Sequence, residues 1–155
     1  MLLGLGSNID GKAQIAKAIE RIAFSFDLLA KSTRYVGPAD GAADGGADGG
    51  ADGEIYSNAA VLIRTADSFK EVRKELRHIE KALGRTREDV RRVEIDIDIL
   101  LIQGEIVRNK HDEIVVPHPD LSTKRHAALP SAEVAPSLVH PKTKERLAEI
   151  AARLA

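Results

Sequence analysis

The sequence predicts an α+β domain with a ferredoxin-like core. Three observations lead to this fold class: short apolar segments typical of strands, two segments with helical periodicity, and the order β-α-β-β-α-β in which they follow one another. With 155 residues, 43% of them apolar and 30% charged, the chain suits a single domain over residues 1–155.

The first half of the core is predicted over residues 2–35. Residues 2–8 are a short apolar run that ends in turn residues, which is typical of a buried strand. Asp10 is placed to cap a helix whose apolar residues recur at roughly helical spacing, namely Ile15, Ile19, Ile22 and Phe26. A second strand is expected over residues 28–35.

Residues 39–54 are tandem tetrads that begin Ala-Asp-Gly. Because so much glycine cannot bury a core, the segment 37–54 is predicted to be a flexible loop. The evenly spaced aspartates leave a Ca²⁺-responsive module open as a weaker alternative, although the glycine-rich Ca²⁺ nonapeptide pattern is not matched. This segment contains five acidic residues and no basic ones, so the rest of the chain has a formal charge of about +4.

The second half of the core is predicted over residues 55–102. Residues 55–64 form a strand in which Tyr56 and Asn58 point to the same face. Ser68 and Glu71 have the spacing of a capping box, and Gly84 is placed to end the helix that follows. A strand over 93–102 completes the core. The apolar residues that this helix buries are Phe69, Val72, Leu76, Ile79 and Leu83.

After the core come an extended segment at 115–119 and a last helix. Thr143 is expected to start this helix, with Leu147, Ile150 and Leu154 facing inward.

The strongest chemical signal is the alternation within residues 93–101. Apolar residues occupy one face of the expected strand, and Glu94, Asp96 and Asp98 occupy the other, with Cα atoms about 6.5–7 Å apart. Carboxylates at this distance repel each other unless a cation offsets the charge. Mg²⁺ takes one or two carboxylates together with substrate phosphates, so a Mg²⁺ site is one interpretation. A solvated polar strand face is the other.

Basic residues surround the predicted strand on both sides. Their guanidinium groups suit phosphate oxygens, but such a run is also typical of a solvated surface. The mild positive charge of the body suits an anionic ligand such as a nucleotide and is too weak to indicate nucleic acid. Without cysteines, a signal segment or a long apolar run, we expect a cytoplasmic protein without a membrane span. The basic set comprises Arg85, Arg87, Arg91, Arg92, His118, Lys124 and Arg125.

These pieces, in this order, resemble the 6-hydroxymethyl-7,8-dihydropterin pyrophosphokinases of folate biosynthesis. No single motif is decisive, but their joint order and spacing cover nearly the whole chain. The matching segments are Gly4-Leu5-Gly6-Ser7-Asn8, Tyr56-Ser57-Asn58-Ala59-Ala60, residues 79–87, Asp96-Ile97-Asp98-Ile99-Leu100-Leu101, Val116-Pro117-His118-Pro119, Arg125 and Glu133-Val134-Ala135-Pro136.

The resemblance implies a monomeric three-layer α/β/α sandwich with a mainly antiparallel sheet. It also implies an enzyme that transfers pyrophosphate from ATP to the hydroxymethyl group of the pterin and releases AMP.

Site residues follow from the same resemblance. Asp96 and Asp98 would bind two Mg²⁺ ions and act in catalysis with Arg87 and Arg92. Asn58 and Tyr56 would contact the pterin. The residues expected around the nucleotide and its phosphates are Glu80, Arg85, Arg87, His118 and Arg125.

Two departures from the family pattern bear on activity. Val93 stands where the family usually has an arginine, so that Arg91 or Arg92 would have to substitute. Ala127 stands where an aromatic residue usually stacks on the pterin. These departures leave open an alternative, a non-catalytic relative that binds nucleotide or metal and has lost pterin binding.

Overall fold

A computed structural model describes residues 1–38 and 55–155 of the chain. The repeat segment 39–54, and with it the predicted flexible loop and the Ca²⁺ alternative, lies outside the described residues. Gly37 and Pro38, which were assigned to that loop, belong to a strand. None of the helices in the described ranges is long and apolar enough to cross a membrane.

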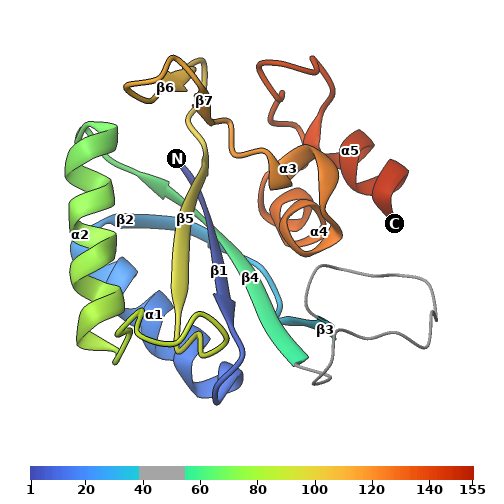
Figure 1. The fold of residues 1–155 in the computed structure, drawn as a ribbon. Coiled ribbons are helices and arrows are strands. Elements are labelled where there is room, and N and C mark those ends of the chain that lie inside the picture. Colours follow the sequence, from blue (N-terminus) through green and yellow to red (C-terminus); the bar gives the residue numbers. More distant parts are fainter. Residues whose placement is uncertain (39–54) are drawn as a thin grey trace.

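The centre of the fold is an antiparallel sheet in the order β2-β4-β1-β5, with β3 pairing with β4. Its strands are β1 (Leu2–Ser7), β2 (Asp27–Lys31), β3 (Tyr35–Pro38), β4 (Ile55–Arg64) and β5 (Asp96–Leu101). This is the strand order of a ferredoxin-like core, as predicted. A hairpin of β6 (Val107–Arg108) and β7 (Ile114–Val116) extends from one end (Figure 1).

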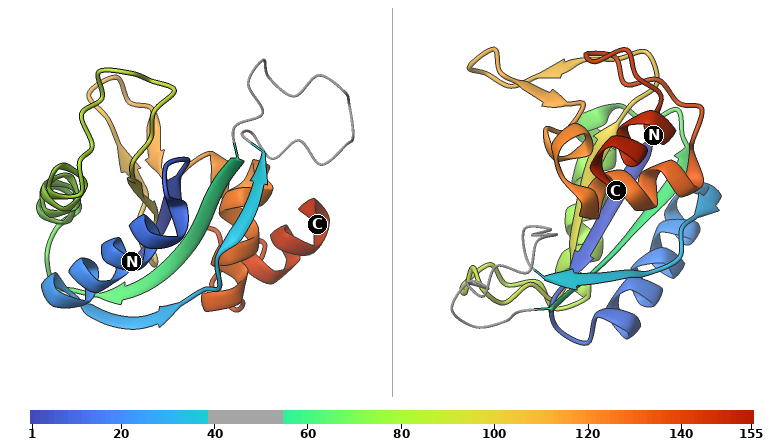
Figure 2. Two further views of the ribbon diagram at one scale, coloured as in Figure 1. Left: turned by 90° about the horizontal axis from the view of Figure 1, so that it is seen from below. Right: turned by 90° about the vertical axis from the view of Figure 1, so that its right-hand side faces the viewer.

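Helices cover both faces of the sheet and make three layers (Figures 1 and 2). On one face lie α1 (Gly11–Ser25) and α2 (Phe69–Ala82), and on the other lie α3 (Asp120–Thr123), α4 (Arg125–Val134) and α5 (Leu147–Leu154). The predicted three-layer α+β fold is therefore confirmed. The sequence did not predict α3 or α4.

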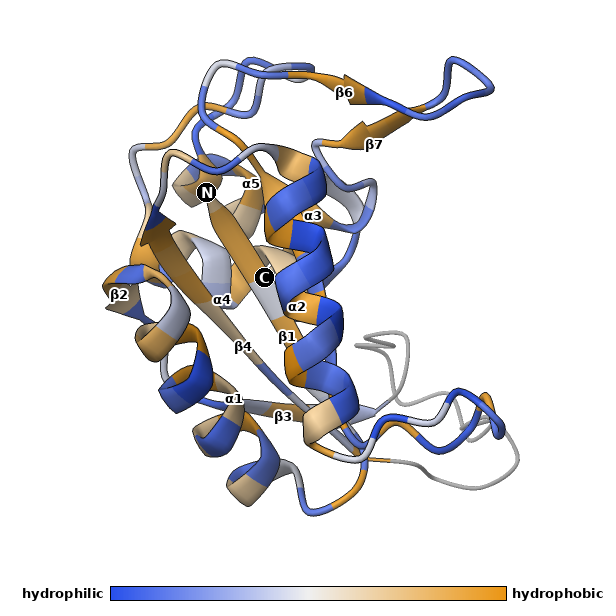
Figure 3. Ribbon diagram, turned by 90° about the vertical axis from the view of Figure 1, so that its left-hand side faces the viewer, coloured by the Kyte–Doolittle hydropathy of each residue, from blue (hydrophilic) through white to orange (hydrophobic). Residues whose placement is uncertain are grey.

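Two apolar clusters lie between these layers. Under α1 and α2, Ile22 and Leu76 pack with Ile97 and Ile99 of β5. On the opposite face, Leu101 packs with residues of the C-terminal helices. The polar outer faces of α1 and α2 in Figure 3 agree with this one-sided burial.

The predicted strand over 28–35 is wrong, because two short strands occupy this range. The break lies at Ser32, whose hydroxyl accepts from the Ala60 backbone N–H at 2.9 Å while its own N–H donates to Ala60 O at 2.9 Å. The serine side chain thus takes a bond that the strand ladder would otherwise make, and β3 starts only at Tyr35.

The helix ends agree with the prediction for α2 and differ from it for α1. The capping box of α2 is confirmed, since Glu71 N–H donates to Ser68 Oγ at 3.4 Å and Ser68 N–H to Glu71 Oε2 at 2.7 Å. Gly84 follows α2 with φ +97°, as expected of a glycine after a helix. Asp10 precedes α1, but its φ of 48° is left-handed and its side chain makes no capping bond, so the predicted cap is wrong.

The predicted start of the last helix at Thr143 is also wrong. Thr143 N–H donates to His140 Nδ1 at 3.1 Å, which holds it in a turn. The helix begins at Leu147, after Arg146 N–H donates to Glu149 Oε2 at 2.7 Å.

Candidate active site

The floor of the candidate site is built by β1 between β4 and β5. In the strand register, Gly6 lies opposite Asn58 on one side and Asp96 on the other, and Gly4 lies opposite Asp98. Neighbouring strands are about 4.8 Å apart, so the Cα atoms of Asn58 and Asp96 are separated by about 10 Å. Because Gly6 carries no side chain, the strip between the Asn58 amide and Asp96 stays open, whereas the Leu100 side chain lies over Gly4.

A pocket of about 270 Å³ opens above this floor. That volume is at the lower end of the range for small-molecule sites. Five residues predicted from the sequence line it together: Tyr56, Asn58, Asp96, Asp98 and His118. They come from β4, β5 and the turn before α3, so the fold gathers residues that are far apart in the chain.

The predicted alternation over 93–101 is correct only in its middle. β5 begins at Asp96, and residues 93–95 precede it as irregular chain. Val93 is therefore outside the strand alternation, and it lines the pocket wall. At the other end the register with β1 shifts between Leu2 and Leu3, and Leu101 turns into the second apolar cluster. Of the three acidic residues, only Asp96 and Asp98 keep the predicted arrangement, while Ile95, Ile97 and Ile99 share the first apolar cluster as expected.

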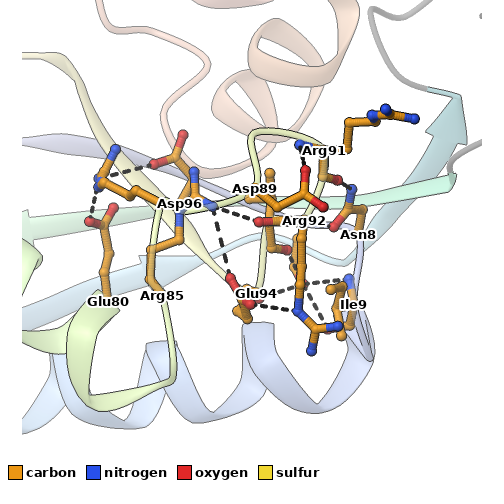
Figure 4. A network of polar contacts seen from close by, with 12 residues as sticks. Asn8, Ile9, Glu80, Arg85, Asp89, Arg91, Arg92, Glu94 and Asp96 are labelled. Atoms are coloured by element: carbon orange, nitrogen blue, oxygen red, sulfur yellow. Dashed lines mark hydrogen bonds and ion pairs between the residues drawn. The ribbon is translucent and has the colours of Figure 1, made fainter.

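Glu94 neither joins Asp96 and Asp98 nor faces solvent. Its side chain is 9% exposed and its Oε1 lies 2.8 Å from Arg92 Nε, while its Oε2 lies 3.8 Å from Arg85 Nη1 (Figure 4). Burial raises the pKa of Glu94, but hydrogen bonds and the positive charges of Arg92 and Arg85 outweigh it and hold the pKa below its ordinary value.

The two aspartates suit a cation. Desolvation within the pocket and then the charge of Asp96 raise the pKa of Asp98. The Asp98 side chain nevertheless remains solvent-accessible. We therefore expect a bound cation to act on the pKa of Asp98 by relieving the repulsion between the two carboxylates. No group of three or more His, Asp or Glu residues in the described ranges is arranged around a metal position. Two carboxylates leave positions for water and phosphate, which fits Mg²⁺.

Arg87 lies beside Asp96 and is anchored by Glu80. Glu80 is 3% exposed, and its carboxylate accepts from Ile97 N–H and from Arg87 Nη2, both at 2.8 Å. Burial raises the pKa of Glu80, whereas these two hydrogen bonds lower it, and the pKa stays above its ordinary value. The same Arg87 Nη2 lies 3.8 Å from Asp96 Oδ1. Glu80 therefore acts from behind the pocket and orients a guanidinium next to Asp96.

The pocket lining that the described residues form does not include the predicted site residues Glu80, Arg85, Arg87, Arg92 and Arg125. The Arg85 side chain is 9% exposed and donates to Arg92 O at 2.7 Å. The Arg92 side chain is 61% exposed but is held by Glu94 (Figure 4). Arg125 is the first residue of α4.

The sequence reasoning missed two polar residues of the pocket, Asp120 and His126. His126 Nε2 lies 3.6 Å from Asp120 Oδ2, and Asp120 N–H donates to His118 Nδ1 at 3.2 Å. The signal available was the position of Asp120 two residues after His118. Ala127 lines the pocket wall, at the position where an aromatic residue was expected to be missing. The neighbouring His126 also lines the pocket and carries an imidazole ring.

Comparison with known proteins decides the family. A family model described as 7,8-dihydro-6-hydroxymethylpterin-pyrophosphokinase (HPPK) matches residues 2–136. The chain belongs to the HPPK family. It is 33% identical over 149 residues to the 2-amino-4-hydroxy-6-hydroxymethyldihydropteridine pyrophosphokinase of Aquifex aeolicus, covering 95% of this chain and 87% of that protein. The Methylorubrum extorquens protein of the same name is 36% identical over 142 residues, covering 88% and 83%.

Solved structures agree on the fold of this HPPK-family chain. The crystal structure of Plasmodium falciparum HPPK-DHPS wild type with pteroate matches with a TM-score of 0.69 at 12% identity. The match covers 98% of this chain, which spans 41% of that longer one. At this identity the likeness supports the three-layer architecture alone.

Proposed function

We propose that this HPPK-family chain transfers pyrophosphate from ATP to the hydroxymethyl group of 6-hydroxymethyl-7,8-dihydropterin and releases AMP, a step of folate biosynthesis. The observation that carries this proposal is that Asp96 and Asp98 open into the same pocket as Asn58, across a floor of glycine. In this proposal the two aspartates mark the end of the pocket that handles the phosphates, and Asn58 marks the end that binds the pterin ring. The two ends are close enough for one pterin to reach from Asn58 to the phosphates.

In the reaction, the hydroxymethyl oxygen forms a bond to the β-phosphorus of ATP and loses its proton. The bond between the β-phosphorus and the oxygen bridging to the α-phosphate breaks, and AMP leaves with that oxygen. Two Mg²⁺ ions held by Asp96 and Asp98 would offset charge on the attacking and leaving oxygens. Arg87, fixed by Glu80 beside Asp96, places a fixed positive charge at the same end.

At the other end, Asn58 and Tyr56 receive the pterin. The Asn58 amide has both donor and acceptor groups, which matches the mixed edge of a pterin ring. His118 and His126 border the pocket on the side of the C-terminal helices. Nucleotide contacts by Arg85, Arg92 and Arg125 stay predictions, and Arg85 and Arg92 would first have to leave Glu94.

The test is to incubate the protein with ATP, Mg²⁺ and 6-hydroxymethyl-7,8-dihydropterin and to follow AMP by chromatography. We expect AMP only when pterin and Mg²⁺ are both present. Folded protein that binds Mg²⁺-ATP but forms no AMP would instead support a non-catalytic relative.

We also propose that the chain acts as a monomer in the cytoplasm on small molecules, without nucleic acid or membrane partners. The nearly balanced charge and the 3% aromatic content support the absence of nucleic-acid binding. Sedimentation at assay concentration tests the monomer.

A further inference from the structure

The end of β1 holds the chain segment that runs into the metal-binding strand. Asn8 makes three contacts with this segment (Figure 4). Its Oδ1 accepts from Val93 N–H at 2.8 Å, its Nδ2 donates to Arg91 O, and its own backbone N–H donates to Val93 O at 3.0 Å. The motif Gly4-Leu5-Gly6-Ser7-Asn8 thus has a second half whose contacts the proposed reaction does not use.

Residues 92–95 lie in no regular element, so side-chain hydrogen bonds contribute much to fixing this segment. Next to Asn8, the fully buried Ser7 donates its hydroxyl to Glu94 O at 2.6 Å. Val93 lies between these bonds and lines the pocket wall, and Asp96 follows three residues later. A shift of this segment would therefore move both a wall residue and the first metal-binding carboxylate.

We propose that Asn8 is a positioning residue of the pyrophosphokinase site, an inference that rests on the proposed function. A carboxamide suits this role because it offers one acceptor and one donor group. The segment presents a backbone N–H at Val93 and a carbonyl at Arg91, two residues apart, which need both. Asn8 is not among the described residues that line the pocket, and it acts through the backbone of Val93, which does line it.

The opposite side of the segment is tethered independently. Arg85, which lies outside the segment, donates to Arg92 O at 2.7 Å and lies 3.8 Å from Glu94 Oε2. Removing the Asn8 carboxamide therefore leaves the segment attached on that side. We expect it to shift within a folded domain, so that catalysis suffers more than folding.

The experiment compares Asn8→Ala with Asn109→Ala. Asn109 is a matched control because its side chain also binds backbone groups: its Oδ1 accepts from His111 N–H at 2.8 Å and Glu113 N–H at 3.1 Å, in the β6–β7 hairpin away from the pocket lining. Steady-state kinetics of AMP formation are measured at a temperature at which circular dichroism shows each variant to be folded.

We expect kcat of Asn8→Ala to fall about 10- to 100-fold, as small misplacements of reacting groups do. The KM for pterin should change by less than about threefold, since Asn58 and Ala127 lie on other elements. The Asn109→Ala variant should keep kcat within about twofold of the wild type. A loss of folded protein would also lower the apparent kcat at an unchanged KM, so both variants are compared only where circular dichroism shows them to be folded.

Should Asn8→Ala fail to fold, Asn8→Asp decides, because it keeps an acceptor for Val93 N–H and lacks the donor to Arg91 O. A reduced kcat in folded Asn8→Asp supports the positioning role, and an unchanged kcat overturns it. An active wild type with an unaffected, folded Asn8→Ala overturns the inference alone. A wild type that forms no AMP refutes the proposed function and the inference with it.

Discussion

Replacing Glu80 tests whether one buried carboxylate both stabilises the fold and orients Arg87. In Glu80→Ala the Ile97 N–H loses its partner inside the protein, which costs about 1–3 kcal/mol. The lost pair with Arg87 adds no more than about 0.5–1 kcal/mol, because the Arg87 side chain is 57% exposed and can turn to water. Removing a buried charge offsets part of this cost.

The net loss expected for Glu80→Ala is about 2–3 kcal/mol. For a domain of this size each kcal/mol lowers the Tm by about 2–4 °C, so the Tm should fall by about 4–12 °C. Glu80→Gln keeps an amide oxygen for Ile97 N–H and should fall by less than about 4 °C. Its amide nitrogen, however, cannot accept from Arg87, so the guanidinium loses its anchor.

Thermal unfolding followed by circular dichroism, together with AMP formation, separates the two effects. Glu80→Gln should remain nearly as stable as the wild type and yet lose at least about tenfold in kcat, because Arg87 no longer stays beside Asp96. A Glu80→Gln variant with wild-type kcat would refute the positioning of Arg87 by Glu80. A Glu80→Ala variant that melts within about 2 °C of the wild type would refute the stabilising role.

Two further variants test the site, and a third tests a contact between α4 and the segment before β3. Asp96→Asn should lower AMP formation at least about 100-fold, while its Tm stays equal or rises because the repulsion from Asp98 is gone; retained activity would contradict the metal role. Gly6→Ala would place a methyl group on the pocket floor, 3.4 Å from Asn58 Oδ1. If it crowds the pterin by about 1–2 kcal/mol, the KM for pterin should rise about 5- to 30-fold. An unchanged KM would show that the pterin does not bind over Gly6. Burial raises the pKa of Glu133, but hydrogen bonds from Thr33 and Tyr35 outweigh it and hold the pKa below 4.5. The Tm of Glu133→Gln should therefore lie about 1–3 °C below the wild type above pH 4.5, and the difference should vanish as the pH falls through the lowered pKa; a difference that persists in acid would rule out the carboxylate as its source.

The elements that the sequence predicted well have local signals. The strand at 55–64 has the predicted bounds, because its alternation and its flanks are visible in the sequence. The helix after Ser68 begins where predicted, because both halves of its capping box lie within four residues. Such signals depend on neighbours in the chain and need no knowledge of the tertiary structure.

Two of the elements that the sequence missed or misplaced depend on distant partners. Ser32 breaks the second strand through Ala60, which lies 28 residues away. α4 begins at Arg125 and contains Pro130 among small residues, so its apolar periodicity is weak and its packing on the sheet decides its helical state.

The same distinction explains why one acidic residue of the three was misplaced. Glu94, Asp96 and Asp98 are equivalent in the alternating pattern, and nothing local separates them. In the fold, the pairing of β1 with β5 reaches from Leu2 to Gly6, which lies opposite Asp96. Beyond Gly6, the side chains of Ser7 and Asn8 hold residues 93 and 94 in place of a strand ladder.

The role of Glu94 is therefore decided by where a strand more than 80 residues earlier in the chain stops pairing. Released from the ladder, the Glu94 side chain turns inward and binds Arg92 and Arg85 rather than a cation. The two arginines that the sequence offered in place of Val93 are affected in turn, since the Arg92 side chain is bound to Glu94 and the Arg91 backbone is bound by Asn8. Among the arginines predicted for the site, the fold thus leaves Arg87 as the one whose guanidinium lies beside Asp96 in the described residues.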